Sequence, residues 1–471
     1  MELKGKKIAV LGLGAVGLSL IRALAKAGAQ VAGLGYENPA ENARIEAELK
    51  KINVKTVFHP IAPDALMSFD YVVMAPFGGM HLEAFEYARE HGKTALNDLD
   101  FILPFLKGKI IGVTGTCGKS TTVAMIGEML KNQGLKVSWV GGDTVDWGRP
   151  ILDPKEYDYC LVEVGSSRLE GTQRFRPHIA VLLNIFPAHG ERHGGSLVKY
   201  VEAKAKIFSN QGPEDYLVID ADAANVQELV RQKKAQGRRV QFSLNNPLDP
   251  WGVYREKGEL VWTGAAGEVS RFNLAETKIG NFPTRAMDAM AAIAVAKLCG
   301  VEDGNIQKAL VAYRPLPGRL HRVRKLDGVI FIDDSQSNNI GSAIWALNSF
   351  SKPILWIAGG DSVFGSRLNT LPSHILGKVR QCIVVGTLAA EIADLFREKL
   401  PVVVVGDLAK AVEIANQAAE PDDIVLFSPA CPPDQANASA GLNRSKVFRE
   451  AVKALQRTPR MLQSYRGFSR I

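Results

Sequence analysis

The chain has 471 residues and a formal net charge of +8, and 46% of its residues are hydrophobic while 23% are charged. This composition is typical of globular proteins, and the length predicts roughly two to four domains with a core each. The modest positive charge comes with no nucleic-acid-binding module, and no apolar run reaches the roughly 18 residues of a membrane-spanning helix, so we expect neither a nucleic-acid partner nor a membrane span.

Three blocks follow one another along the chain, and in each of them short apolar runs alternate with helical patterns. This alternation favours parallel sheets with helices on both faces. We predict α/β domains at residues 1–107, 108–314 and 315–471, with a linker at residues 314–319.

The predicted elements can be given in chain order. In the first block the strands are residues 7–11, 30–33, 71–74 and 94–96, and the helices are 18–27 and 82–91. In the second block the strands are 109–113, 137–140, 159–164, 179–185 and 216–219, the runs 240–244 and 251–262 are antiparallel edge strands, and the helices are 119–133 and 284–298. In the third block the strands are 329–332, 354–358, 382–385, 402–405 and 424–427, and the helices are 341–350, 389–400, 408–418 and 444–455.

The cysteines are widely spaced, odd in number and without a CxxC pair. They are Cys117, Cys160, Cys299, Cys382 and Cys431. This usage argues against a disulfide framework or a zinc site and is typical of a reducing compartment. The N-terminal apolar run passes directly into a glycine turn, unlike a signal peptide, so we predict a cytoplasmic protein.

The first glycine-rich loop, GLGAVG, has glycines at positions 12, 14 and 17 between a predicted strand and a helix. In this context the helix N-terminus can bind a phosphate through its free N–H groups. A NAD site would also need an acid at the end of the next strand, and no acid occurs there before Glu37. Three interpretations of this loop remain open: it binds NAD, it binds another phosphate-bearing ligand, or it is a tight turn that binds nothing. The residues that would bind are Gly14, Ala15, Val16 and Gly17.

The second glycine-rich loop reads TGTCGKSTT at residues 114–122, again between a strand and a helix. Its backbone amides are expected to surround phosphates, Lys119 to reach the terminal ones, and the hydroxyl of Ser120 or Thr121 to bind Mg²⁺. Val113 stands where a strict Walker A motif has glycine, so the loop is a variant. It predicts an ATP site that includes Gly115, Thr116 and Gly118.

Further motifs in the same order resemble the Mur ligase family. They are VEVGSSRLE at 162–170, NIFPAHGERHG at 184–194, YVEAKAKIF at 200–208, LPGR at 316–319, DDSQSNN at 333–339 and SPAC at 428–431. The resemblance spans nearly the whole chain and is nearest to the members that add D-glutamate. It implies a three-domain fold with a Rossmann-like N-terminal domain, a central P-loop ATPase domain and a Rossmann-like C-terminal domain.

The resemblance also implies a reaction and roles for single residues. ATP would phosphorylate the carboxylate of a UDP-N-acetylmuramoyl-L-alanine-type substrate, and the amine of an amino acid would then form the amide. Lys119 would hold the γ-phosphate, and Ser120 and Glu163 one Mg²⁺. His189 and a carbamylated Lys204 would hold a second Mg²⁺, and Arg319 and Asp334 would serve ATP from the third domain. We expect a monomer that acts in peptidoglycan precursor synthesis.

Several family positions carry other residues in this chain. The acid that would contact uracil falls at Gly35 or Tyr36, and the Asn that would contact the diphosphate falls at Asp143. The acid before the metal-binding histidine is replaced by Ala188, and the Asn that reads adenine is replaced by Asp288. The Lys of the DSKAT motif is replaced by Gln336. The GGDGK-type loop is residues 359–363 without its Lys, and Pro432, Pro433 and Ala436 stand in the D-glutamate region. Loss of a charged contact removes the ability of a binding site to distinguish its substrate from similar molecules. Two alternatives therefore stay open: a ligase of this fold with another acid or amine, and a non-catalytic nucleotide-binding relative.

Overall fold

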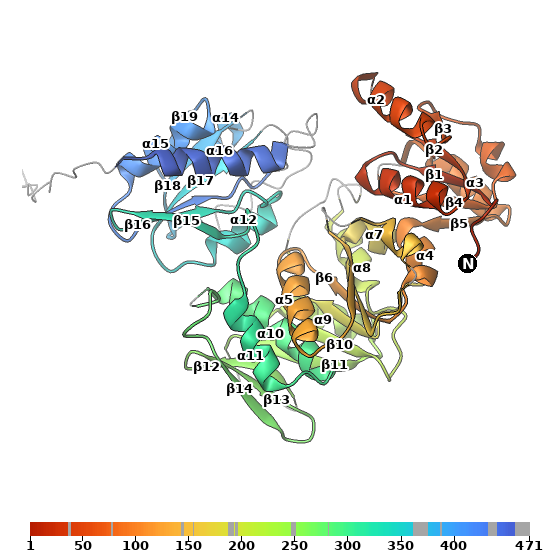
Figure 1. The fold of residues 1–471 in the computed structure, drawn as a ribbon. Coiled ribbons are helices and arrows are strands. Elements are labelled where there is room, and N and C mark those ends of the chain that lie inside the picture. The colour runs from red at the N-terminus through yellow and green to blue at the C-terminus, as the bar shows by residue number, and fades with distance from the viewer. Residues whose placement is uncertain are drawn as a thin grey trace, which may run out of the picture. The chain divides into compact units, whose positions relative to one another are not determined.

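The structure is a computed structural model. It describes residues 1–35, 39–76, 79–142, 146–153, 155–186, 193, 196–245, 251–280, 282–360, 375–386, 389–431 and 440–456. The chain divides into two compact units, Met1–Arg314 and Pro315–Ile471. The first unit contains two sheets and the second contains one (Figure 1).

The first sheet is parallel and has the strand order β3-β2-β1-β4-β5. Its strands are β1 (Lys7–Leu11), β2 (Gln30–Leu34), β3 (Lys55–Val57), β4 (Tyr71–Met74) and β5 (Thr94–Asn97). The helices around it are α1 (Ala15–Lys26), α2 (Pro39–Lys50), η1 (Pro63–Ser68), η2 (Gly79–His81), α3 (Leu82–Glu90), α4 (Asp98–Ile102) and η3 (Leu103–Phe105). The strand order changes direction between β1 and β4, the place where α/β sheets of this kind bind ligands.

The second sheet has nine strands in the order β14-β13-β12-β11-β10-β9-β6-β8-β7. They are β6 (Lys109–Thr114), β7 (Val137–Gly141), β8 (Tyr159–Glu163), β9 (Ile179–Leu182), β10 (Tyr216–Asp220), β11 (Arg238–Ser243), β12 (Gly252–Glu256), β13 (Glu259–Thr263) and β14 (Val269–Asn273). The helices are α5 (Lys119–Asn132), α6 (Arg149–Leu152), α7 (Ser166–Gly171), α8 (Leu197–Ala205), α9 (Ala224–Gln232), α10 (Pro283–Leu298) and α11 (Asp303–Ala312).

Alternate residues of the central strands enter cores on opposite faces of this sheet, as the two-residue period of a strand requires. On β9, Ile179 and Val181 pack in the core under α5, α10 and α11, which lie side by side in Figure 1. Ala180 and Leu182 pack in the core that α8 and α9 cover. Both faces of β9, the strand that pairs with β6 before the second glycine-rich loop, are therefore buried.

One strand prediction in this domain was wrong. The run 240–244 lies in β11, which pairs in parallel with β10 and with β12 and is not an antiparallel edge strand. The run 251–262 does form an antiparallel pair, β12 and β13, around the turn at Lys257 and Gly258, both with positive φ. The sheet continues past β11, so the short polar-flanked sequence of β11 was mistaken for an edge.

The second unit has a mixed sheet in the order β15-β16-β20-β17-β18-β19, in which only β15 runs antiparallel to its neighbour. The strands are β15 (His321–Leu326), β16 (Val329–Asp333), β17 (Ile354–Gly359), β18 (Val379–Val385), β19 (Val402–Val405) and β20 (Ile424–Phe427). The helices are α12 (Ile340–Leu347), α14 (Ala389–Phe396), α15 (Leu408–Ala418) and α16 (Ala440–Ala454).

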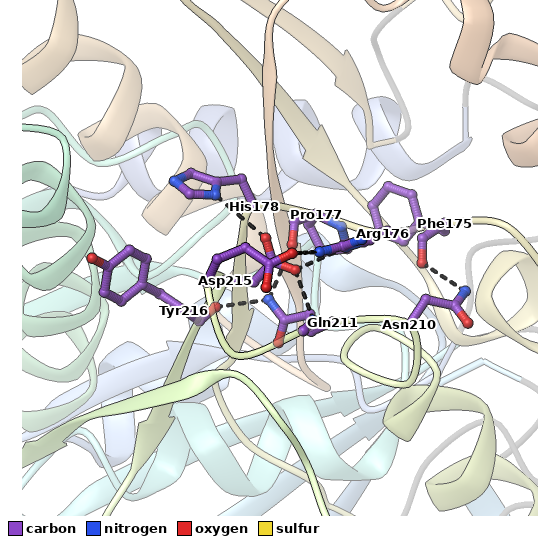
Figure 2. Close-up of polar contacts among 10 residues, drawn as sticks. Phe175, Arg176, Pro177, His178, Asn210, Gln211, Asp215 and Tyr216 are labelled. Atoms are coloured by element: carbon purple, nitrogen blue, oxygen red, sulfur yellow. Dashed lines mark hydrogen bonds and ion pairs between the residues drawn. The ribbon is translucent and has the colours of Figure 1, made fainter.

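A polar cluster fixes the amino ends of β9 and β10 (Figure 2). Asp215 accepts a hydrogen bond from Arg176 Nε across 2.9 Å, and its Oδ1 lies 3.4 Å from His178 Nδ1. Gln211 donates to the carbonyls of Pro177 and Tyr216. Because these contacts lie at the sheet edge opposite to the glycine-rich loop, we read the cluster as structural.

The described helices include none that is long and apolar enough to cross a membrane. All five cysteines are free thiols. Four of them are buried and Cys299 is partly exposed.

Candidate active site

The loop between β6 and α5, residues 114–119, is held from the neighbouring strand β9 and from α8. Asn184 accepts a hydrogen bond from Cys117 N across 2.9 Å and donates one to the Cys117 carbonyl across 3.2 Å. Thr116 N donates to the Asn184 carbonyl, and Thr116 Oγ1 lies 2.7 Å from the Tyr200 hydroxyl. The loop is thus fixed before any ligand binds, which lowers the entropy cost of binding.

Gly118 is required at its position for two reasons. Its φ of +84° lies in the left-handed region, and a Cβ built there would lie 2.1 Å from Asp288 Oδ1. Asp288 is buried in α10, so the loop passes directly over that helix. Only glycine provides both the backbone conformation and the space.

Lys119, the first residue of α5, folds back over the loop. Its Nζ donates to the carbonyls of Gly115 and Thr116 at 2.9 and 3.1 Å. The ammonium group therefore lies at the mouth of the loop, where the helix N-terminus also favours an anion. This is the placement expected of a group that meets the outer phosphates of ATP.

Ser120 and Glu163 meet beside the loop at the carboxyl ends of β6 and β8. Ser120 Oγ donates to Glu163 Oε1 across 2.9 Å, while Glu163 Oε2 is buried and has no hydrogen-bond partner among the described residues. The side chain of Glu163, a residue 5% exposed, packs against Gly142, where a Cβ would lie 2.9 Å from Oε2. A buried carboxylate oxygen without a partner is costly, and a divalent cation would satisfy it.

These donors fit Mg²⁺, which prefers a few protein oxygens and completes its shell with water and phosphate. The described residues contain no group of three or more His, Cys, Asp or Glu side chains that would form a site from protein ligands alone. Ser120 and Glu163 are therefore suited to a cation that is bound to the phosphates of a nucleotide.

Lys204 lies in the last turn of α8, close enough to Lys119 for their charges to interact, and is only 2% exposed. Its Nζ lies 4.8 Å from the centre of the Tyr200 ring. Burial, reinforced by the charge of Lys119, holds the pKa of the Lys204 amine well below its usual range. A neutral amine is the form that adds to carbon dioxide, so this environment suits carbamylation.

The first glycine-rich loop precedes α1 in the first sheet. A Cβ at Gly17 would lie 1.8 Å from the Gly12 carbonyl oxygen, so the third glycine of the motif is required for close packing. The helix α1 begins at Ala15, three residues before the predicted start, and its N-cap residue Gly14 makes no side-chain cap. The amides of the first helical turn, which includes Ala15, Val16 and Gly17, have no acceptor within the helix and suit a phosphate group.

Position 35, directly after β2, is closely packed, so the acidic side chain that the family motif carries nearby would require its neighbours to move. A Cβ there would lie 2.9 Å from Leu13 Cδ1 and 3.2 Å from Phe58 Cδ1. The carbonyl of Gly35 is 2.9 Å from Nε2 of the buried His81.

Arg319 and Asp334 lie in the second unit. Asp334 accepts hydrogen bonds from Leu320 N across 3.0 Å and from Ser428 Oγ across 2.9 Å, and these join the LPGR, DDSQSNN and SPAC segments. Burial raises the pKa of the Asp334 carboxyl to about 7, although these hydrogen bonds and the charge of Arg319 act in the opposite direction.

Other predicted positions lie outside the described residues. They are His189, Tyr36, Glu37, Asp143, Ala188, residues 361–363, Pro432, Pro433 and Ala436. Sequence reasoning also missed Asn184 and Tyr200 as supports of the loop, although both stand in motifs quoted above.

Comparison with known proteins identifies the family. The Mur ligase middle domain matches residues 113–296, and the Mur ligase glutamate ligase domain matches residues 318–431. The UDP-N-acetylmuramoylalanine–D-glutamate ligase of Myxococcus xanthus is 34% identical over 440 residues, which cover 92% of this chain and 94% of the relative.

Solved structures share the fold at lower identity. A pseudomurein peptide ligase type C from Methanothermus fervidus is 17% identical with a TM-score of 0.59, covering 95% of this chain and 99% of its own. A MurF ligase from Thermotoga maritima, solved in complex with ADP, is 18% identical with a TM-score of 0.57 and covers 96% of both chains. The matching domain models and the 34% identical relative show that the chain belongs to the Mur ligase family, and these structures share its fold.

Proposed function

We propose that this chain is an ATP-dependent ligase that joins D-glutamate to UDP-N-acetylmuramoyl-L-alanine in the cytoplasm. The observation that carries the proposal is the loop of residues 114–119, with Lys119 at its mouth and Glu163 Oε2 buried beside Ser120. The substrates are those named for the 34% identical relative.

The first step transfers the γ-phosphoryl group. An oxygen of the substrate carboxylate attacks the γ-phosphorus, and the bond from phosphorus to the β,γ-bridging oxygen breaks. ADP departs, and the substrate becomes an acyl phosphate. Lys119 and the amides of residues 115–118 would bind the phosphates and offset the charge that builds on the transferred group. Because Asn184 and Tyr200 already fix the loop, these donors need little rearrangement during the step.

The second step forms the amide. The amine nitrogen of D-glutamate attacks the carbonyl carbon of the acyl phosphate and loses a proton, and inorganic phosphate leaves as the carbon–oxygen bond breaks. Lys204, as a carbamate, would add a negative charge near Lys119. Arg319 and Asp334 would bind ATP from the second unit.

Ser120 and Glu163 would hold one Mg²⁺, and His189 with carbamylated Lys204 a second. When bound, the ions would neutralise phosphate oxygens and orient the γ-phosphoryl group. The open amides of Gly14, Ala15, Val16 and Gly17 would bind the UDP-linked substrate.

A ligase of the same fold with a different substrate is the second candidate. The observation in its favour is Gly35, one of the two positions of the uracil-side acid, where an acidic side chain would require Leu13 and Phe58 to move. In that case the chemistry of the two steps would be unchanged, but another base, acid or amine would be bound.

Product analysis tests the proposal. Purified protein is incubated with ATP, Mg²⁺, UDP-N-acetylmuramoyl-L-alanine and D-glutamate, and the mass of the UDP product is measured. A mass increase of one glutamyl residue, absent with L-glutamate, supports the D-glutamate ligase. An unchanged mass with D-glutamate but an adduct with another amine would support the second candidate.

A further inference from the structure

His193 is a buried histidine whose two ring nitrogens both face α7. The residue is 2% exposed, its Nε2 lies 3.0 Å from Ser166 Oγ, and its Nδ1 lies 3.0 Å from Glu170 Oε2. Ser166 is the first residue of α7 and Glu170 lies one turn later. One imidazole therefore bridges the beginning and the end of this short helix.

The two contacts differ in kind. The contact of Nε2 with Ser166 Oγ is a hydrogen bond whose direction depends on the tautomer of the ring. Nδ1 and Glu170 Oε2 lie at ion-pair distance without hydrogen-bond geometry. The hydrogen bond to Ser166 is therefore the contact that links the buried ring to the start of α7.

Ser166 lies three residues after Glu163, and the turn between them is held on both sides. Thr114 Oγ1 donates to the Val164 carbonyl across 2.8 Å, and Val164 N donates to the Val113 carbonyl. Gly165 follows, and a Cβ there would meet nothing within 4 Å, so packing around its Cα does not fix it. The hydrogen bond between His193 and Ser166 therefore holds the chain in place directly after this glycine.

The other side of the imidazole faces the phosphate-binding loop. The ring centre lies 5.6 Å from that of Tyr200 in an edge-on arrangement, and the Tyr200 hydroxyl lies 2.7 Å from Thr116 Oγ1. His193 thus lies between the turn that carries Glu163 and the residue that holds Thr116. A displaced imidazole would loosen both the turn after Glu163 and the contact of Tyr200 with Thr116.

We propose that His193 is a positioning residue that, through Ser166, holds the Glu163 carboxylate in the geometry for Mg²⁺ with bound nucleotide. The inference rests on the proposed function only in taking Glu163 as the Mg²⁺ ligand, and it requires no turnover. Groups that orient metal ligands commonly change metal affinity by roughly 10- to 100-fold when they are removed.

The experiment measures Mg²⁺-dependent binding of a fluorescent ATP analogue to the full chain. Mg²⁺ is titrated at a fixed analogue concentration for the wild type, His193→Ala, His193→Gln and Ser166→Ala. The matched control is His178→Ala, which removes another histidine beside a carboxylate of the same unit, at the opposite edge of the sheet. Thermal unfolding of each variant separates a loss of stability from a loss of positioning.

We expect His193→Ala and Ser166→Ala to raise the Mg²⁺ concentration for half-maximal binding about tenfold. His193→Gln, whose amide can replace Nε2 toward Ser166, should recover most of this loss, and His178→Ala should leave the concentration unchanged. An unchanged Mg²⁺ requirement in His193→Ala, or nucleotide binding by the wild type that ignores Mg²⁺, would overturn the inference. A wild type that binds Mg²⁺ and nucleotide normally but forms no product would overturn the proposed function alone.

Discussion

Ser120 Oγ donates a hydrogen bond to Glu163 Oε1 across 2.9 Å, which joins the first turn of α5 to the end of β8. Within the described ranges, Oε2 of the same carboxylate is buried without a hydrogen-bond partner. A hydroxyl next to the glycine-rich loop and a carboxylate 43 positions away thus meet where we propose that Mg²⁺ binds. The predictions below test this relationship and its surroundings.

Glu163→Gln should raise the Mg²⁺ concentration needed for half-maximal activity by roughly 10- to 100-fold. The amide keeps an acceptor for Ser120 but loses the negative charge that attracts the cation. Activity measured against Mg²⁺ at saturating ATP gives the value. Equal Mg²⁺ requirements in the variant and the wild type would contradict the assignment.

Gly118→Ala should weaken nucleotide binding, because the buried Asp288 carboxylate, whose Oδ1 would lie 2.1 Å from the new Cβ, would have to move. Gly134→Ala is the matched control, since Gly134 has nearly the same φ of +83° but nothing within 4 Å of its Cβ. That control should cost only the left-handed strain of about 1–2 kcal/mol and should bind nucleotide normally. Equal binding by the two variants would show that Asp288 imposes no constraint on the loop.

Lys204→Met should abolish activity and, compared with wild-type protein freed of carbon dioxide, also raise the melting temperature at neutral pH. The folded-state pKa of Lys204 lies well below 10.5, so between the two values the unfolded chain binds more protons, and stability rises with pH. Methionine removes this cost of burying an amine. Scanning calorimetry from pH 6 to 9 measures the effect, and a lower melting temperature across that range would contradict it.

Bicarbonate tests the modification of Lys204 directly. If the neutral amine forms a carbamate, removal of dissolved carbon dioxide should lower wild-type activity several-fold and added bicarbonate should restore it. A carbamate signal in the carbon NMR spectrum of protein given labelled bicarbonate should be absent from Lys204→Met. Activity that does not respond to bicarbonate would remove the carbamate from the proposal.

Because of Asp334, the free energy of unfolding of the second unit should decrease as pH rises. Its folded-state pKa of about 7 exceeds the ordinary value of 3.8, so between these values the folded state binds more protons. Asp334→Asn should therefore flatten the pH dependence of unfolding between pH 4 and about 7, an effect on the order of a few kcal/mol. Asp220→Asn, which removes a carboxyl of similarly raised pKa from the first unit, should leave the second unit's pH dependence intact.

The sequence predicted the parts of the site that lie close together along the chain. The spacing of Gly118, Lys119 and Ser120 after an apolar strand is enough to place them at a helix N-terminus. Glu163 could be added because it ends a buried strand, and parallel strands end at the same edge of a sheet.

The contacts that support the site could not be predicted in this way. The hydrogen bonds of Asn184 and Tyr200 to the loop bridge 67 and 84 positions, and no local pattern encodes them. Short elements such as β3, with three residues, and α7, with six, have too few residues to show a period. The parallel pairing of β11 likewise depends on its neighbours rather than on its own sequence.

Phosphate release from ATP tests the central claim most directly. The protein is assayed with Mg²⁺, UDP-N-acetylmuramoyl-L-alanine and D-glutamate, each substrate is omitted in turn, and Lys119→Ala is compared with Lys131→Ala, which changes an exposed lysine of the same helix. We predict release that needs both substrates, survives in Lys131→Ala and falls at least about 100-fold in Lys119→Ala. Tight ATP binding without substrate-dependent release would contradict the D-glutamate ligase and favour another substrate or a non-catalytic role.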